Sequence, residues 1–368
     1  MKYALKQLSH QVFGCGSYAY KDTQSQDGQI YLPIDDAHFA LYSNDSGKSW
    51  KTLPLAQGRK TDRFIQLQDG SFYALSFDNV VHDAIRSFDQ ENIPFVAGIY
   101  RAKSMEDVCA GNVSSSFTQI QIPRLSVGFG DSNNSHTSCI SNGLIQLSNG
   151  DILATMYGQT KDDTTLCPYF RENGGYDFYL YRSWCILSKD GGNTFSFLST
   201  IADVQTYPIP DVNAEGYCEP DIIEIEPGHI VCVIRTGGHE VYSPLYCTHS
   251  YDSGRTWEAP YPICSWGVLP KLFTMTDGTL VCVSGHIHTM LLFSSDKGRT
   301  WSEPQIIEPC DGKWGNSPSG YNTAFESSPG EITIVYDDPK EGIQEGAPEG
   351  QLRRIYVRTY SVERENEA

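Results

Sequence analysis

Residues Cys218 to Trp257 read CEPDIIEIEPGHIVCVIRTGGHEVYSPLYCTHSYDSGRTW. The stretch opens with an apolar strand pattern, a Pro227-Gly228 turn and a second apolar strand that ends at Arg235. It closes on a Ser-x-Asp-x-Gly-x-Thr-Trp pattern, and both halves recur elsewhere in the chain. A recurring unit of this size predicts a repeat architecture, so the number of units decides the fold.

The turn of this stretch occurs six times as an X-Gly pair, each followed by a strand-like run. The six glycines are Gly28, Gly70, Gly150, Gly228, Gly278 and Gly330. Four of the pairs are Asn-Gly or Asp-Gly, which tolerate the positive φ that tight hairpin turns require. The spacing therefore predicts six hairpins.

The closing pattern, an Asp box, occurs four times after these turns, at Ser43–Trp50, Ser188–Phe195, Ser250–Trp257 and Ser294–Trp301. A degenerate copy is expected near Ser104–Phe117. We expect each Asp to accept hydrogen bonds from the turn backbone and each aromatic ring to lie between neighbouring sheets. The boxes are therefore predicted to be structural.

Six units of about four short strands predict an all-β fold, a six-bladed β-propeller that spans residues 1–368 as one domain. A β-sandwich would not explain the repeat, and a solenoid would need shorter, more regular units. The first strand, near Lys2–Phe13, is expected to complete the last sheet and close the ring. Insertions at 78–94 and 159–179 are expected to lie on the binding face.

Composition narrows the classes of partner. The formal net charge of -18 argues against nucleic acid, and no apolar run is long enough to span a membrane. The N-terminus lacks the apolar core of a signal peptide, so we expect a cytoplasmic protein, or a secreted one if a leader has been removed. Eleven cysteines without a CxxC pair are interpreted as small buried side chains in a reducing compartment.

The turn glycines provide a common frame for residues at the other end of the strands. Glu219 and Tyr321 each lie nine residues before a turn glycine, at the start of an inner strand. Arg235 lies seven residues after Gly228, where the paired strand returns to that end. Arg63 and Lys271 lie seven residues before Gly70 and Gly278. Since residues two apart on a strand share a face, all five side chains are predicted to converge.

The boxes together with CEPDIIEIEPGHIVCVIRTGG and GYNTAFESSPGEITIVYDD resemble the bacterial sialidase (neuraminidase) superfamily with BNR/Asp-box repeats. The resemblance is clearest from Gly216 to Tyr336. It implies that Tyr321 is the catalytic nucleophile, that Glu219 accepts its proton, and that Arg235 binds the substrate carboxylate. A neutral phenol suits a sugar whose anomeric carbon bears a carboxylate, because a carboxylate nucleophile would be repelled.

Two family positions differ in this chain, and a third, that of the general acid, has several candidates. The place of the first arginine reads CGSYAYKD, without Arg, and Arg63 is the candidate replacement; Lys271 is a further candidate substrate-binding cation. The place of the third arginine carries His286 and His288, which are candidates for binding or acid–base work. The family's general acid is an Asp on an early-blade insertion; Asp78, Asp83 and Asp89 lie there, and Asp83 is our choice.

The sequence thus predicts an exo-acting, retaining glycoside hydrolase that removes a terminal, acidic sugar such as sialic acid, without a cofactor or metal. One alternative is a hydrolase or lyase acting on another terminal sugar, such as a uronate or deoxy sugar. Another is a non-catalytic propeller that binds glycan or protein, in which Glu219 and Arg235 form only a structural ion pair. A carbohydrate is the expected partner, with neither nucleic acid nor membrane.

Overall fold

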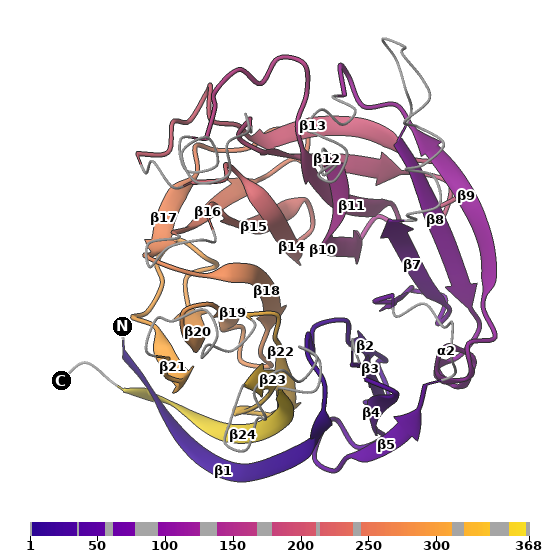
Figure 1. The fold of residues 1–368 in the computed structure, drawn as a ribbon, viewed down its shortest axis with the longest axis vertical. Helices are drawn as coiled ribbons and strands as arrows, with labels where there is room; N and C mark the ends of the chain where they lie inside the picture. Colours follow the sequence, from indigo (N-terminus) through magenta and orange to yellow (C-terminus); the bar gives the residue numbers. More distant parts are fainter. Residues whose placement is uncertain are drawn as a thin grey trace, which may run out of the picture.

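The computed structural model describes residues 2–34, 37–55, 62–77, 95–125, 138–167, 179–210, 214–237, 244–310, 320–338 and 353–365. These residues form six four-stranded antiparallel sheets arranged as a ring about one axis (Figure 1). The predicted six-bladed β-propeller is confirmed. Asp83, like the rest of the first insertion at 78–94, lies outside the described residues.

Each blade begins with an inner strand at the axis and ends with an outer strand at the rim, and its strands are hydrogen-bonded to one another in that order. Blade 1 contains β2 (Thr23–Gln24), β3 (Ile30–Pro33), β4 (Phe39–Ser43) and β5 (Lys51–Pro54). Blade 2 contains β6 (Ile65–Gln66), β7 (Phe72–Phe77), β8 (Phe95–Ala102) and β9 (Ser114–Ile120). Blade 3 contains β10 (Ser138–Gln146), β11 (Ile152–Gly158), β12 (Arg182–Ser188) and β13 (Ser196–Ala202).

The second half of the ring has the same plan. Blade 4 contains β14 (Cys218–Glu226), β15 (His229–Arg235), β16 (Leu245–Ser250) and β17 (Tyr261–Cys264). Blade 5 contains β18 (Val268–Thr274), β19 (Leu280–Gly285), β20 (Thr289–Ser294) and β21 (Gln305–Glu308). Blade 6 contains β22 (Thr323–Ser328), β23 (Glu331–Asp338), β24 (Arg354–Glu365) and, as its outer strand, β1 (Lys2–Cys15).

The first strand closes the ring, as predicted. β1 pairs antiparallel with β24 from Lys2–Glu365 to Cys15–Arg354, and the two strands lie side by side at the rim in Figure 1. The ring of Tyr3 in β1 stacks on Phe293 of blade 5, with centroids 4.5 Å apart. One blade is therefore built from both ends of the chain, so opening the ring requires breaking a full sheet edge.

The Asp boxes and the inner turns lie at the same end of the strands. In blade 4, Ser253 N–H donates to Gly228 O at 3.0 Å, which joins the box to the turn. Asp252 accepts from Thr256 N–H at 2.8 Å. The indole N–H of Trp257 donates to Ser199 Oγ of blade 3 at 3.1 Å. The boxes are thus structural staples within and between blades, as predicted from their composition.

Blade 2 carries a short helix where a degenerate box was expected. α2 (Met105–Ala110) is capped by Ser104, whose side chain accepts from Asp107 N–H, and ends at Gly111 in the left-handed conformation. A capped helical turn thus replaces the staple between β8 and β9. No helix in the described part of the chain is long and apolar enough to cross a membrane.

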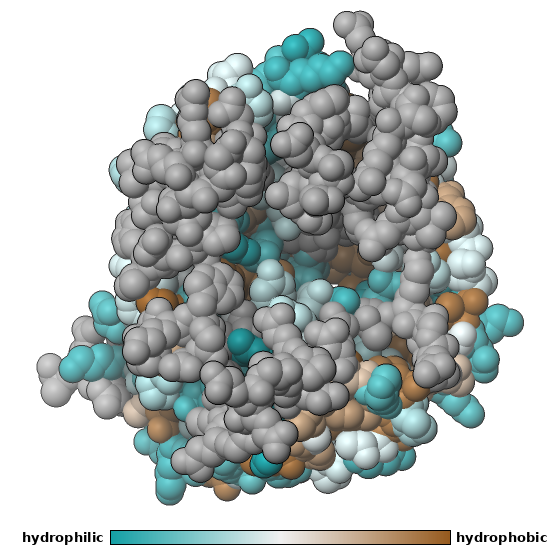
Figure 2. Space-filling model, viewed as in Figure 1, coloured by the Kyte–Doolittle hydropathy of each residue, from teal (hydrophilic) through white to brown (hydrophobic). Residues whose placement is uncertain are grey.

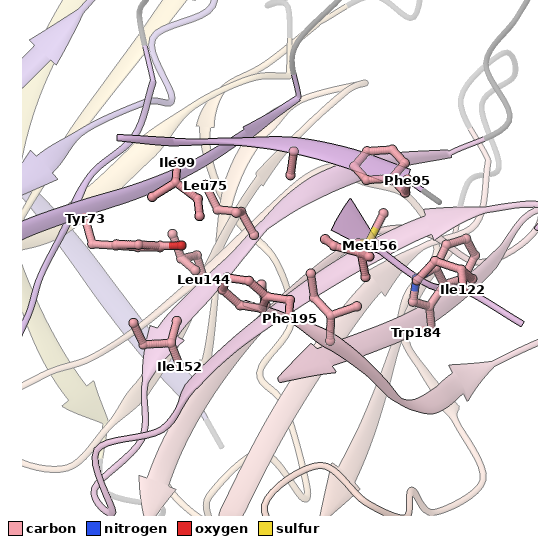
Figure 3. Packing of buried hydrophobic residues seen from close by; sticks show 14 of the residues in the cluster. Tyr73, Leu75, Phe95, Ile99, Ile122, Leu144, Ile152, Met156, Trp184 and Phe195 are labelled. Carbon is pink, nitrogen blue, oxygen red and sulfur yellow. The ribbon is translucent and has the colours of Figure 1, made fainter. Parts of the chain in front are cut away.

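The core lies between adjacent blades. Figure 3 shows one such cluster, in which Tyr73 and Ile99 of blade 2 face Ile152, Met156 and Trp184 of blade 3. All five side chains are almost completely buried, which is the main favourable term for holding two blades together.

Cys232 and Cys282 occupy equivalent buried positions in β15 and β19, and burial raises the pKa of both thiols. These two are packed as small apolar side chains, as predicted, but Cys15 is exposed, so the prediction is wrong for that cysteine.

Candidate active site

The end of the strands opposite the boxes brings residues from blades 4, 5 and 6 together. In blade 4, Cys218 pairs with Arg235, and the register shifts between Cys218 and Asp221. Glu219 lies in this bulge with φ 48, and Leu269 occupies the matching bulge of blade 5 with φ 41. Left-handed backbone costs a non-glycine residue about 1–2 kcal/mol, so the surrounding packing must compensate for it.

The Glu219 carboxylate is buried and accepts three hydrogen bonds. Its Oε1 accepts from Arg235 Nη1 at 2.6 Å and from Tyr321 Oη at 3.0 Å. Its Oε2 accepts from Leu269 N–H at 2.9 Å. A carboxylate with these donors has one fixed orientation. Three of the residues predicted to converge, Glu219, Arg235 and Tyr321, therefore do so.

Arg235 is shared between two carboxylates. Besides Glu219, its Nη2 lies 3.2 Å from Glu215 Oε2, and its Nε donates to Gly237 O at 2.7 Å. Burial alone would lower the pKa of Arg235, but the two carboxylates outweigh it and raise that pKa. Glu215, Glu219 and Arg235 carry a combined charge of −1, because two acids face one base.

Glu215 was not identified from the sequence. It lies in the short connection before β14, where Glu215 N–H donates to Thr236 O at 2.7 Å and Tyr181 N–H donates to Glu215 O at 2.8 Å. The adjacent Gly216 has φ +98, and a Cβ there would collide with the Tyr181 backbone. A glycine in that conformation was the available signal that the chain turns sharply to bring Glu215 beside Arg235.

Tyr321 forms the more exposed half of the hydroxyl–carboxylate pair: its side chain is half-buried, whereas only 6% of Glu219 is exposed. The rings of Tyr18 and Tyr20, from the connection between β1 and β2, contact its ring edge-to-face, with centroids 5.2 and 5.4 Å away. The Glu219 charge, followed by burial, raises the pKa of Tyr321 well above its usual value. The phenol is therefore protonated at neutral pH and donates to Glu219.

Lys271 and Arg63 contact a different set of residues, which we call the axial layer: Asp22, Arg63, Asp221, Lys271 and Thr323. Lys271 Nζ donates to Asp22 and Thr323, and only 3% of the lysine is exposed. Arg63 Nη1 donates to Asn142 O at 2.5 Å and lies 4.0 Å from Asp221 Oδ1. The expectation that both cations join Tyr321 and Glu219 is therefore not met.

The physical reason is depth along the strand. Tyr321 and Glu219 lie nine residues before their turn glycines, whereas Lys271 lies seven before its own. Lys271 lies in the regularly paired part of β18, whereas Glu219 lies in a bulge and Tyr321 two residues before β22, so the two sets lie at successive heights and do not share one strand face. Burial works against the charged form of Asp22, but the charges of Lys271 and Arg63 outweigh it and lower its pKa to about 2. The axial layer is thus a buried ionic network.

His286 and His288 lie in the bend between β19 and β20, outside both strands. His288 Nδ1 accepts from Cys310 N–H at 2.9 Å, its ring contacts the Trp266 ring edge-to-face, and burial lowers its pKa. His286 is buried with φ 50 and packs beside Gly320, the residue before Tyr321. The bend therefore directs the two side chains into different surroundings.

Figure 2 looks down the same axis as Figure 1 and shows hydrophilic residues in the middle of the face, where the inner strands converge. No group of three or more His, Cys, Asp or Glu side chains in the described ranges is arranged to hold a metal ion. The chemistry that these residues offer is proton transfer from a phenol to a fixed carboxylate, beside one guanidinium.

The solved structures that match this chain share its propeller fold. A protein of unknown function from Dyadobacter fermentans matches with a TM-score of 0.60 at 14% identity, over 98% of this chain and 99% of that one. The α-L-arabinofuranosidase of Fusarium graminearum, solved with arabinobiose, matches with a TM-score of 0.57 at 11% identity, over 96% and 98%. The Hadza microbial sialidase Hz136 matches with a TM-score of 0.52 at 14% identity, over 94% and 66%.

A search of curated proteins finds no match. A family model described as a BNR repeat-like domain matches residues 131–334, more than half of the chain. This range contains three of the four Asp boxes together with Glu219, Arg235 and Tyr321. The chain belongs to the BNR repeat-like family, within the sialidase-like superfamily that its boxes resemble.

Proposed function

We propose that the protein is an exo-acting, retaining glycoside hydrolase in which Tyr321 attacks the anomeric carbon and Glu219 accepts the phenolic proton. The observation that carries the proposal is the 3.0 Å hydrogen bond from Tyr321 Oη to Glu219 Oε1, with the phenol on the more exposed side of the pair. A phenol whose pKa is raised is a weak nucleophile by itself, so it needs a base at this distance.

The reaction has two steps. In the first, a bond forms between Tyr321 Oη and the anomeric carbon, the glycosidic bond breaks, and the phenolic proton passes to Glu219. The leaving oxygen takes a proton from a general acid, for which Asp83 remains the prediction. In the second, water attacks the anomeric carbon, the bond from that carbon to Tyr321 Oη breaks, the acid recovers its proton from the water, and Glu219 returns its proton to the released Tyr321 oxygen. Two displacements retain the configuration.

A terminal sialoside is the first candidate substrate, because a neutral phenol is not repelled by a carboxylate on the anomeric carbon. Arg235 would then bind that carboxylate. One observation favours a second candidate, a sugar without this carboxylate: Arg235 already contacts both Glu219 and Glu215. A net charge of −1 in this group favours the positive charge that develops on a neutral sugar in the transition state.

The test is an assay of the purified protein on an aryl sialoside, an aryl α-L-arabinofuranoside and aryl glycosides of uronic and deoxy sugars. Tyr321→Phe and Glu219→Gln are expected to lower kcat by at least about 10²-fold on whichever sugar is cleaved, without a change in Tm. The matched control is Tyr251→Phe, an exposed tyrosine in the box of blade 4, which should leave kcat unchanged.

Two outcomes would overturn the proposal. Turnover that survives in both variants would exclude Tyr321 and Glu219 from the chemistry. Absence of turnover on every glycoside, with binding retained on a glycan array, would instead support the non-catalytic glycan-binding propeller.

A further inference from the structure

Lys271 is a buried cation at the centre of the axial layer. Its Nζ donates to Asp22 Oδ1 and, at 2.5 Å, to Thr323 Oγ1, and Thr323 Oγ1 donates to Asp22 Oδ1 at 2.7 Å. Gln24 Nε2 holds the other oxygen of Asp22 at 2.6 Å. At most 3% of Lys271, Asp22 or Thr323 is exposed. These contacts join the inner strands of blades 5, 1 and 6 across the axis.

Two of the blades that Lys271 joins, blades 5 and 6, also donate hydrogen bonds to Glu219 of blade 4. In blade 5, Leu269 N–H donates to Glu219, and Lys271 follows two residues later. In blade 6, Tyr321 donates to Glu219, and Thr323 follows two residues later. The separation between these strands at the axial layer therefore constrains their separation one layer above, where Tyr321 must reach Glu219.

We propose that Lys271, acting with Asp22 and Thr323, is a positioning residue that keeps Tyr321 within hydrogen-bond distance of Glu219, and that this role requires its ammonium charge. The inference rests on the proposed function. A neutral amine would lose its attraction to Asp22 and leave that buried carboxylate without its main counter-ion, so the contact between blades 5 and 6 would loosen.

The surroundings of Lys271 lower its pKa, so the lysine loses its charge within the pH range of an activity assay. The charged groups that face it are Asp22, Arg63 and Asp221. Burial lowers the pKa of Lys271 to about 8, with Asp22 acting in the opposite direction and Arg63 in the same one. Since the pKa of Tyr321 lies well above 10, an activity loss near pH 8 would not come from the phenol.

The test compares pH profiles of kcat for the wild type, Lys271→Arg and Asp22→Asn on the substrate found above. The wild type should lose activity above about pH 8. Lys271→Arg should retain measurable activity and lack this alkaline limb, because a guanidinium keeps its proton. Asp22→Asn should move the limb to lower pH, because the carboxylate that favours the charged lysine is gone. A limb that stays in place in both variants would overturn the inference.

A second set of variants separates positioning from substrate binding. Lys271→Met should lower kcat by about 10²-fold with KM almost unchanged, because a displacement of about 1 Å suffices for such a loss. Thr323→Val removes one hydroxyl, preserves the charge pair between Lys271 and Asp22, and should lower kcat about fivefold. This variant provides the test if Lys271→Met does not fold. Lys297→Met is the control, since Lys297 is an exposed lysine that pairs with Glu226 at the turn end of the ring.

Two readouts distinguish this inference from the proposed function. A raised KM with unchanged kcat in Lys271→Met would mean that the lysine binds substrate and does not position the pair. A crystal structure needs no turnover: in Lys271→Met, Tyr321 Oη should move beyond about 3.5 Å from Glu219 Oε1, outside hydrogen-bond distance, and in the milder Thr323→Val the bond should lengthen without breaking. An unchanged distance would overturn the inference, whereas a wild type inactive on all glycosides overturns only the proposed function.

Discussion

Gly320 gives the sharpest test of how the fold positions Tyr321. It immediately precedes the tyrosine and has φ +85. A Cβ on Gly320 would collide with Val268 Cγ2 of blade 5 and lie 3.2 Å from His286 Cβ. Gly330, in the turn at the other end of the same blade, has φ +78 and no atom within 4 Å of such a Cβ. The two glycines thus have the same left-handed backbone, which would strain an alanine at either position, but only Gly320 is crowded.

The expected magnitudes follow from that difference. Alanine at either position costs about 1–2 kcal/mol of backbone strain, and crowding adds about 1–3 kcal/mol at Gly320 alone. We therefore expect Gly330→Ala to lower the free energy of unfolding by about 1–2 kcal/mol and Gly320→Ala by about 2–5 kcal/mol. Because the collision lies next to Tyr321, Gly320→Ala should also lower kcat by about 10²-fold, and Gly330→Ala should not.

The assay is urea unfolding of both variants beside kcat measurements at a temperature where each is folded. Equal losses of stability would show that the approach of Val268 to Gly320 is not tight. A Gly320→Ala enzyme with wild-type kcat would refute the idea that this close packing between blades 5 and 6 sets the position of Tyr321.

Three further predictions concern the scaffold and are measured by chemical or thermal unfolding. Trp184→Ala should cost about 3–5 kcal/mol, because Trp184 fills the core between blades 2 and 3 and is completely buried. Tyr3→Ala should likewise destabilise the ring closure by about 3 kcal/mol, whereas Leu8→Ala on the same strand, at a residue that is 48% exposed, should be nearly neutral. The pKa of Asp190 is lowered to about 2, mainly by the hydrogen bond from Thr194 N–H. Asp190→Ala should therefore lower the free energy of unfolding by an amount on the order of 1 kcal/mol after solvent screening. This loss should be constant above about pH 4 and vanish as the pH falls to about 2.

The repeat made much of the fold and part of the site predictable from the sequence. Each turn glycine marks the same end of an inner strand, so counting back from it gives the height of a residue along the axis. Counting in this way predicted that Glu219 and Tyr321, which are 102 residues apart in sequence, occupy equivalent places. The prediction held because the blades repeat about one axis and their inner strands have the same irregularity: a register shift occurs just before the turn in both β14 and β22.

The same count explains what the sequence did not resolve. Lys271 and Arg63 differ from Tyr321 and Glu219 by two residues, which changes the layer, and the sequence did not show the bulge at Glu219 that interrupts the strand face. Asp22, which neutralises Lys271, precedes a two-residue strand too short to show a periodic pattern. Glu215 lies outside any strand, so no rise per residue fixes its height. Its approach to Arg235 depends on a sharp turn and on the contacts of its own backbone.

The two ends of the blades therefore have different roles: one stabilises the fold and the other forms the candidate active site. At one end four of the six blades carry an Asp box, whose internal hydrogen bonds fix the hairpin beside the inner turn, and blade 2 has the capped helix α2 instead. At the other end the blades contribute different residues: an acid from blade 4, a backbone N–H from blade 5 and a phenol from blade 6. The inner strands connect these two ends, and the axial layer lies between the turns and the reacting pair. We therefore expect a change in the packing of the axial layer to change the distance from Tyr321 to Glu219.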